Sequence, residues 1–263
     1  MQPLLAAHFL PDLVPPEELS GGTVVVIDVL RASTTISQAL AAGVRAVIPA
    51  LEVDEARRIA AVLPPGEALL GGEREGLPIA GFDLGNSPSE FRPETVGGRT
   101  VVFTTTNGTR AMNRCRAAAR VLIGAFVNLS AVCETIEKSG ATSLAPIHLL
   151  CAGTRGRITR EDVLFAGAVI DRLLADGAVD EMAQNDQARI ARAAWRDAVG
   201  GESPISAARL AAELRNTQGG RNLKAIHLER DIDDVARLDS LRVVPELNLA
   251  AWRIEPANLN KKS

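Results

Sequence analysis

The sequence predicts an α/β fold in which a mostly parallel or mixed sheet lies between two layers of helices. Short apolar runs alternate with helix-like stretches along most of the chain, an order typical of parallel sheets that carry helices on both faces. The run from Val24 to Leu30 is apolar except for Asp28, as expected of a strand buried on both faces. The 263 residues suit a single catalytic unit over 1–263, or two lobes with a boundary near residue 140.

Each element has a local signal in chain order. Ser33 or Thr34 can cap a helix that Gly43 ends, and Pro64-Pro65 closes the next helix. Before residue 178, strands are expected at 23–30, 44–50, 67–72, 100–105, 120–125 and 146–153, and helices at 33–43, 53–63, 107–117, 128–140 and 160–177. After it, helices are expected at 182–199, 204–215, 219–228 and 231–238, and strands at 242–247 and 249–255. Two stretches begin alike, VVVIDVLRASTT and VVFTTTNGTRA, which fits two similar subdomains but also a generic strand-to-helix turn.

Composition excludes several classes of function. The chain has 29 Lys and Arg against 32 Asp and Glu, a net charge of −3, whereas nucleic-acid-binding domains usually show a basic stripe or a high pI. We therefore expect no nucleic-acid partner. The apolar runs are short, the first residues lack a basic signal-peptide region, and three Cys form no paired framework. We expect a cytoplasmic protein without a membrane partner, and the sequence leaves open whether it forms a homo-oligomer.

The first group of candidate site residues follows the strand that ends near Asp28. A carboxylate at the tip of a buried strand suits a magnesium ligand or a nucleophile that accepts a phosphoryl group. Arg31 and the amides of a helix beginning near Ser33 and Thr34 can hold phosphate oxygens. Magnesium and Arg31 would also compensate the buried charge of Asp28. The alternative is an aspartate that caps a turn beside a surface arginine.

The second group lies after the strand expected at 100–105. Hydroxyl groups, a glycine and a new helix start together predict an anion cradle. Its candidate substrate-binding residues are Thr105, Thr106, Asn107, Gly108 and Arg110. An Asn-Gly pair usually signals a hairpin, but the MNRCRA stretch that follows it is helical in pattern, which favours the cradle.

The third group lies after the strand expected at 146–153. Gly153 lets backbone amides approach a ligand, Arg155 is a candidate substrate-binding residue, and Cys151 is a candidate catalytic residue. Glu161 and Asp162 open the next helix. They are candidate metal ligands, although carboxylates there also simply complement the helix dipole.

A long loop over 72–98 adds more polar residues. It is rich in Gly, Pro, Asn and Asp, and so long a loop in a compact domain is usually functional or mobile. Glu73, Asn86 and Ser87 are its candidate substrate-binding residues. We expect this loop to form a lid or part of the ligand shell.

At these motifs the sequence resembles the 2-phosphosulfolactate phosphatase (ComB-like) family. The resembling stretches are VVVIDVLRASTTISQAL, LLGGEREGLPIAGFDLGNSP, VVFTTTNGTRA and CAGTRGRITREDVLFAGAVID. The resemblance implies a magnesium-dependent phosphatase that releases sulfolactate and phosphate, a step towards coenzyme M. The expected partner is therefore a small anionic phosphate ester, to whose charged groups Arg31, Arg110 and Arg155 can donate bidentate hydrogen bonds.

Two other mechanisms and one other class stay open. A haloacid-dehalogenase-type mechanism needs Asp-x-Asp, and Asp28-Val29-Leu30 lacks the second Asp. A cysteine phosphatase needs Cys-x5-Arg at a strand end, a spacing that Cys151 and Arg157 match. A non-catalytic anion-binding module on the same fold is the alternative to an enzyme. Attack by water with help from magnesium is the mechanism we favour.

Overall fold

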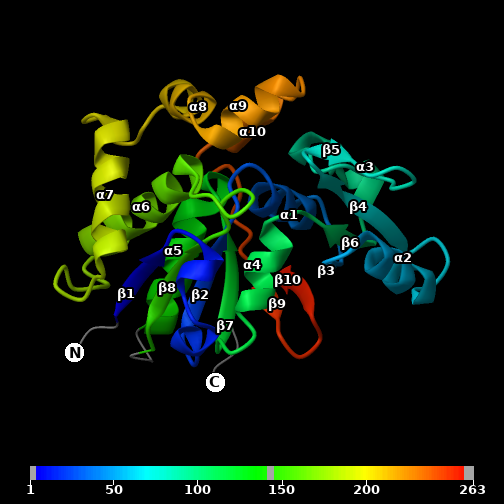
Figure 1. Cartoon of the computed structure of the whole chain (residues 1–263), viewed down its shortest axis with the longest axis horizontal. Coiled ribbons are helices and arrows are strands. Elements are labelled where there is room, and N and C mark those ends of the chain that lie inside the picture. The colour runs from blue at the N-terminus through cyan, green and yellow to red at the C-terminus, as the bar shows by residue number, and fades with distance from the viewer. Residues whose placement is uncertain (1–3, 141–144, 258–263) are drawn as a thin grey trace.

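A computed structural model describes residues 4–140 and 145–257, and Figure 1 shows their arrangement. The strands are Leu5–His8 (β1), Thr23–Ile27 (β2), Ala46–Pro49 (β3), Ala68–Arg74 (β4), Leu77–Pro78 (β5), Thr100–Thr104 (β6), Arg120–Gly124 (β7), Ile147–Cys151 (β8), Pro245–Asn248 (β9) and Arg253–Pro256 (β10). The α-helices are Ala32–Ala41 (α1), Val53–Val62 (α2), Pro93–Val96 (α3), Gly108–Arg114 (α4), Leu129–Gly140 (α5), Arg160–Ala175 (α6), Asp186–Val199 (α7), Ala207–Arg215 (α8), Gln218–Ala225 (α9) and Arg230–Val235 (α10). Short 3₁₀ turns lie at Pro11–Leu13 (η1), Pro16–Leu19 (η2), Pro88–Glu90 (η3) and Phe126–Asn128 (η4).

All ten strands join one mixed sheet in the order β1-β8-β2-β7-β9-β10-β3-β6-β4-β5. The strands β1, β8, β2 and β7 form one parallel block, and β3, β6 and β4 form a second. The antiparallel hairpin of β9 and β10 lies between the blocks and pairs with β7 on one side and β3 on the other. The second block comes entirely from residues between β2 and β7 in the sequence.

The central strand β2 shows why this sheet needs helices on both faces. Val24 and Val26 point into a core shared with α1 and α4, whereas Val25 and Ile27 point into a core shared with α5 and α6. All four side chains are fully buried. Alternate side chains of a strand point to opposite faces, so the continuous apolar run of β2 requires an apolar layer on each side.

The predicted α/β fold with a mixed, mostly parallel sheet is confirmed. The expected strands and helices are all present, with ends shifted by a few residues. Sequence patterning missed β1, which is short and pairs with β8. It also missed β5 and α3, which lie within the loop expected over 72–98. The two strands expected at the end of the sequence are β9 and β10, and they lie in the middle of the sheet. The sheet is continuous across the expected boundary near residue 140, because β8 pairs with β1 and β2.

The C-terminal helices α8, α9 and α10 lie together at one end of the molecule, near the ends of β2 and β8 (Figure 1). Within residues 4–140 and 145–257, none of the helices has the combined length and apolar character that a membrane span requires. The C-terminal helices α8, α9 and α10 cover the carboxyl end of β2 (Figure 1), and the polar residues that follow β2 are buried.

Candidate active site

Asp28 directly follows β2, and its carboxylate is buried between the first residues of two helices. The backbone amides of Ala32, at the start of α1, and of Gly108, at the start of α4, are hydrogen-bonded to it. A Cβ atom on Gly108 would lie 2.9 Å from Asp28 Oδ2, so only glycine permits this close approach. The first two groups of candidate residues, which follow β2 and β6, are thus close together, and Asp28 lies between them.

The protonation of Asp28 is strongly perturbed. Its pKa is raised to about 7, mainly by burial and then by the carboxylates of Glu73 and Glu161, although the amides of Ala32 and Gly108 lower it. A carboxyl group with this pKa exchanges its proton near neutral pH, and groups perturbed in this way are concentrated in functional sites. Asp28 is therefore the centre of the candidate active site.

The two acidic residues at the start of α6 have different surroundings. Asp162 accepts hydrogen bonds from the amides of Val29 (2.9 Å) and Gly153 (3.0 Å) and from the Thr159 hydroxyl. Both of its oxygens are therefore used to hold the loops after β2 and β8 together. Burial raises the pKa of Asp162, and the carboxylates of Asp28 and Glu161 raise it further. We read Asp162 as a structural anchor of the site.

Glu161 differs because one of its oxygens is available. Its Oε1 accepts a hydrogen bond from the Gly219 amide at 3.0 Å, whereas none of the described residues hydrogen-bonds to its buried Oε2. Burial raises the pKa of Glu161, and Glu161 in turn raises that of Asp28. Of the two predicted metal ligands on α6, Glu161 is the one with a free acceptor near Asp28.

Glu73, at the end of β4, joins the loop after β6 to the turn after β4. Its Oε1 accepts from the Thr106 amide and its Oε2 from the Gly76 amide, both at 2.7 Å. Thr106 in turn has a buried hydroxyl oxygen without a hydrogen-bond partner among the described residues. Glu73 therefore acts as a brace between two loops, and Thr106 offers a polar atom beside it.

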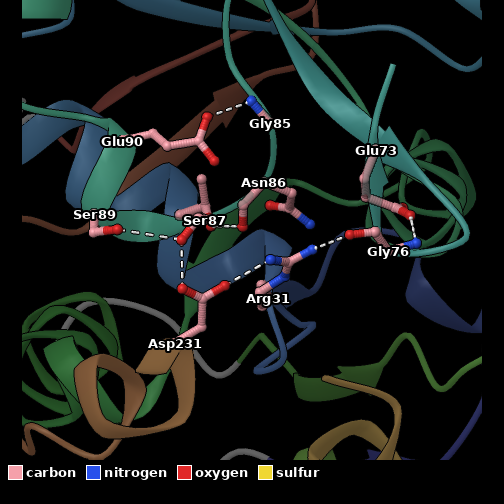
Figure 2. A network of polar contacts seen from close by, with 10 residues as sticks. Arg31, Glu73, Gly76, Gly85, Asn86, Ser87, Ser89, Glu90 and Asp231 are labelled. Carbon is pink, nitrogen blue, oxygen red and sulfur yellow. Dashed lines mark hydrogen bonds and ion pairs between the residues drawn. The ribbon is translucent and has the colours of Figure 1, made fainter. Parts of the chain in front are cut away.

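Arg31 is buried, and the structure places it in a network that the sequence did not predict (Figure 2). Its Nη1 donates to Asp231 Oδ2 at 2.6 Å, and its Nη2 donates to the Gly76 carbonyl at 2.7 Å. The Ser87 hydroxyl makes a very short hydrogen bond to the other oxygen of Asp231. We expected Arg31 to compensate the charge of Asp28, but the buried ion-pair partner of Arg31 is Asp231.

Asn86 lies next to this network. Its backbone carbonyl accepts from the Thr35 hydroxyl of α1 at 3.0 Å, which fixes the loop against that helix. Its side-chain Oδ1 is buried without a partner among the described residues, and Figure 2 shows the side chain lying beside Arg31. Asn86 thus remains a candidate substrate-binding residue, as the sequence predicted, whereas Ser87 mainly serves to hold Asp231.

The hydroxyls of Ser33 and Thr34 have structural partners. Ser33 Oγ accepts from the Asp28 amide at 2.9 Å, and Thr34 Oγ1 donates to the Val29 carbonyl at 2.9 Å. The first amide of α1 is directed to Asp28. These groups shape the turn after β2 and position Asp28, and the binding of phosphate at Ser33 and Thr34 stays a prediction.

The loops after β6 and β8 are joined at the rim of the site. Asn107 Oδ1 accepts from the Arg155 amide at 3.0 Å, and Thr105 Oγ1 accepts from the Thr109 amide at 3.3 Å. Asn107-Gly108 starts helix α4 rather than a hairpin. The side chain of Arg155 is exposed and pairs weakly with exposed Glu75 at 3.4 Å.

Cys151 is the last residue of β8, and it is fully buried in the same core as Ile147 and Leu149. Burial raises its pKa well above the ordinary value for a thiol, with Asp162 and Glu161 adding to the effect. A reactive cysteine needs an electropositive, partly exposed setting that stabilises the thiolate. The buried thiol beside two carboxylates argues against Cys151 as a catalytic nucleophile.

The donor atoms around Asp28 fit a hard cation. Among the described residues, no three His, Cys, Asp or Glu side chains gather into a ready-made metal cluster. Magnesium, however, usually keeps several waters and takes only one or two carboxylates from the protein. Asp28 and Glu161 supply two carboxylates, and the unpartnered Glu161 Oε2 is an oxygen atom, the ligand type that magnesium prefers.

Asp231 is the site residue that the sequence did not reveal. It is the first residue of the helix expected at 231–238. One signal was present: Asp231 lies four residues before Val235, on the side of the helix that also carries Ile232. Both apolar side chains are buried, so a carboxylate in the same stripe needed a buried partner.

Comparisons with known proteins identify the family of this chain. The sequence profile of a family described as "2-phosphosulpholactate phosphatase" matches residues 8–249. A protein of Symbiobacterium thermophilum is 38% identical over 234 residues, which cover 89% of this chain and 94% of the relative. One from Synechococcus sp. is 39% identical over 245 residues (91% and 94%), and one from Deinococcus radiodurans is 38% identical over 244 residues (92% of each). All three are described as "Probable 2-phosphosulfolactate phosphatase".

Proposed function

This chain belongs to the 2-phosphosulfolactate phosphatase family and is thus a phosphoric monoester hydrolase, and on that premise we propose its substrate and cofactor. The substrate is a small phosphate ester that carries further anionic groups, with 2-phosphosulfolactate as the first candidate. The products are then sulfolactate and inorganic phosphate. The cofactor is Mg²⁺, held in the pocket of carboxylates around Asp28.

The observation that carries this proposal is the environment of Asp28. A buried carboxylate with a pKa near 7, next to Glu73 and Glu161, is destabilised by its acidic neighbours unless a cation or a proton compensates it. A divalent cation relieves that repulsion, and the cation in turn favours binding of an anionic ester. The carboxylate cluster therefore supports metal-assisted phosphate chemistry better than a plain anion-binding function.

We assign the following roles in cation and phosphate binding to residues of the protein. Asp28 and Glu161 would hold the cation, and the buried Asn86 Oδ1, whose side chain lies beside Arg31 (Figure 2), is available to the substrate. When bound, magnesium neutralises charge on the transferring phosphoryl group and orients or acidifies a water molecule. Arg31 uses two of its five N–H donors on Asp231 and Gly76, and we assign a donor that remains free to a phosphate oxygen.

We assign recognition of the other anionic groups to the arginines at the rim. Arg110 is exposed on α4 and is not constrained by any ion pair among the described residues. Arg155 is exposed on the adjoining loop, where its pairing with Glu75 is long and solvated and is therefore weak. A guanidinium group matches carboxylate or sulfonate geometry with two parallel hydrogen bonds.

The test is release of inorganic phosphate by the purified protein. We expect turnover of p-nitrophenyl phosphate and faster turnover of 2-phosphosulfolactate, both lost in excess EDTA and restored by added Mg²⁺. Phospholactate, which lacks the sulfonate group, serves as the matched substrate control and should show a higher KM. Absence of turnover with every ester in the presence of Mg²⁺ would refute the proposed function, and full turnover in EDTA would refute the metal requirement.

A further inference from the structure

One buried carboxylate connects three segments that are far apart in the sequence. Asp231, in the first turn of α10, is 2% exposed. One of its oxygens bonds Arg31, in the turn after β2, and the other bonds Ser87, in the loop before η3 (Figure 2). Arg31 and Ser87 are separated from Asp231 by 200 and 144 residues. Asp231 thus links both segments to α10, in addition to the Thr35–Asn86 hydrogen bond that joins α1 to the loop before η3.

Each segment held by Asp231 carries a residue of the candidate site. Arg31 follows three positions after Asp28, and its second bond, to the Gly76 carbonyl, reaches the turn that Glu73 braces. Ser87 is the immediate neighbour of Asn86, whose Oδ1 is buried without a partner among the described residues. A change at Asp231 would therefore remove one contact of Arg31 and one contact of the residue next to Asn86.

We propose that Asp231 is a positioning residue of this active site, which fixes the guanidinium of Arg31 and the loop of Asn86 in the geometry that binds a phosphate group. Asp231 itself need not touch the substrate, because both of its oxygens are already occupied. The proposal rests on the proposed phosphatase function for its kinetic readout. It adds that the C-terminal helix α10 is part of the catalytic apparatus and more than a cover over it.

The reasoning about positioning is geometric. An arginine retains rotational freedom about its side-chain bonds, and an acceptor on one edge of the guanidinium fixes the direction of its remaining donors. A displacement of about 1 Å in a reacting group can cost about 100-fold in rate. Loss of the Asp231 charge would also leave the Arg31 charge buried without its ion-pair partner, so the arginine would turn towards other acceptors.

The experiment compares three variants in the intact chain. Asp231→Asn keeps the shape of the side chain and removes its charge, and Ser87→Ala removes only the hydrogen bond on the side of Asn86. The matched control is Asp233→Asn on the same helix, because the Asp233 side chain is 58% exposed and pairs with exposed Arg215. The readouts are kcat and KM with p-nitrophenyl phosphate and Mg²⁺, the Kd of inorganic phosphate by calorimetry, and the melting temperature.

Asp231→Asn should lower kcat by about 100-fold and weaken phosphate binding at least about tenfold, at a temperature where the variant is folded. Ser87→Ala should raise KM several-fold, and Asp233→Asn should behave as the wild type does. A merely structural Asp231 would lower the melting temperature but leave kcat and phosphate affinity per folded molecule within about twofold of wild type, and that result would overturn the proposal.

The design keeps the two proposals separable. If Asp231→Asn does not fold, Ser87→Ala decides, since an unchanged KM and an unchanged phosphate Kd in that variant would contradict the positioning role. If the wild type hydrolyses no ester, the proposed function fails. The ratio of phosphate affinities between wild type and Asp231→Asn then still tests the role of Asp231.

Discussion

Replacing Asp28 by Asn removes the charge at the centre of the site and keeps the shape of the side chain. Burial and the carboxylates of Glu73 and Glu161 raise the folded-state pKa of Asp28 from 3.8 to about 7. Because the folded pKa lies above the unfolded one, the folded state binds the proton more tightly. Ionisation of Asp28 therefore destabilises the fold progressively as the pH rises from about 4 to about 7, and the penalty is constant above that range.

The size of the effect follows from the pH window. From about pH 5 to about pH 7, Asp28 is ionised in the unfolded protein but protonated in the folded protein. The penalty grows by roughly 1.4 kcal/mol per pH unit over these two units, which amounts to about 3 kcal/mol between pH 5 and pH 8. The Asp28→Asn variant has no such penalty. Its stability relative to wild type should therefore be about 3 kcal/mol more favourable at pH 8 than at pH 5. The hydrogen bonds that Asn makes to Ala32 and Gly108 affect both pH values alike and cancel in this difference.

The assay is urea unfolding of both proteins at the two pH values, without divalent cations, together with kcat in the presence of Mg²⁺. Every other titrating group is common to the two proteins, so the difference isolates Asp28 and the carboxylates that face it. We expect turnover to be abolished in the variant. An equal stability difference at both pH values would refute the raised pKa, and a near-normal kcat would show that Asp28 is a turn residue.

Three further outcomes follow from the same geometry. Cys151→Ala should keep kcat within a few-fold of wild type. It should lower the unfolding free energy by about 1–2 kcal/mol, the usual cost of a small cavity. Loss of turnover in the folded variant would restore the thiol mechanism. Arg110→Ala should raise the KM for 2-phosphosulfolactate about tenfold with an unchanged melting temperature, and exposed Arg58→Ala on α2 is the control; equal KM values would remove Arg110 from the site. Glu161→Gln should weaken Mg²⁺ binding in a calorimetric titration and leave the fold intact. Asp162→Asn should chiefly lower the unfolding free energy, by about 1–3 kcal/mol for the lost buried acceptor. The reverse pattern would exchange the assigned roles.

Much of the fold could be predicted because its signals are local. The apolar run of β2, the glycine that ends α1 and the helix after Gly108 each depend on neighbouring residues. The predicted cap of α1 was wrong, because α1 begins at Ala32 and Ser33 and Thr34 lie inside it. The residues at the ends of parallel strands could also be predicted, because ligands bind beyond those ends. Asp28 was predicted in this way, whereas Glu73 and Asn86 were predicted from the density of polar residues in the loop over 72–98.

The remainder depends on contacts between distant segments. Nothing in the spacing of Arg31 and Asp231 reveals their ion pair, since 200 residues separate them. Cys151 and Arg157 match a phosphatase spacing, but the register of β8 against β2 turns Cys151 into the core beside Leu149. Glu161 and Asp162 look equivalent in sequence, and only the position of the loops after β2 and β8 decides which carboxylate keeps a free oxygen.

The seam between the two parallel blocks has a consequence for how the chain is made. The block of β3, β6 and β4 emerges from the ribosome early, and β7 follows it, but the hairpin of β9 and β10 that joins β3 to β7 is translated after all other strands. Until then both strands carry unpaired backbone groups along one side, the kind of edge at which chains associate. This edge is therefore open in the nascent chain until residues 245–256 have been translated.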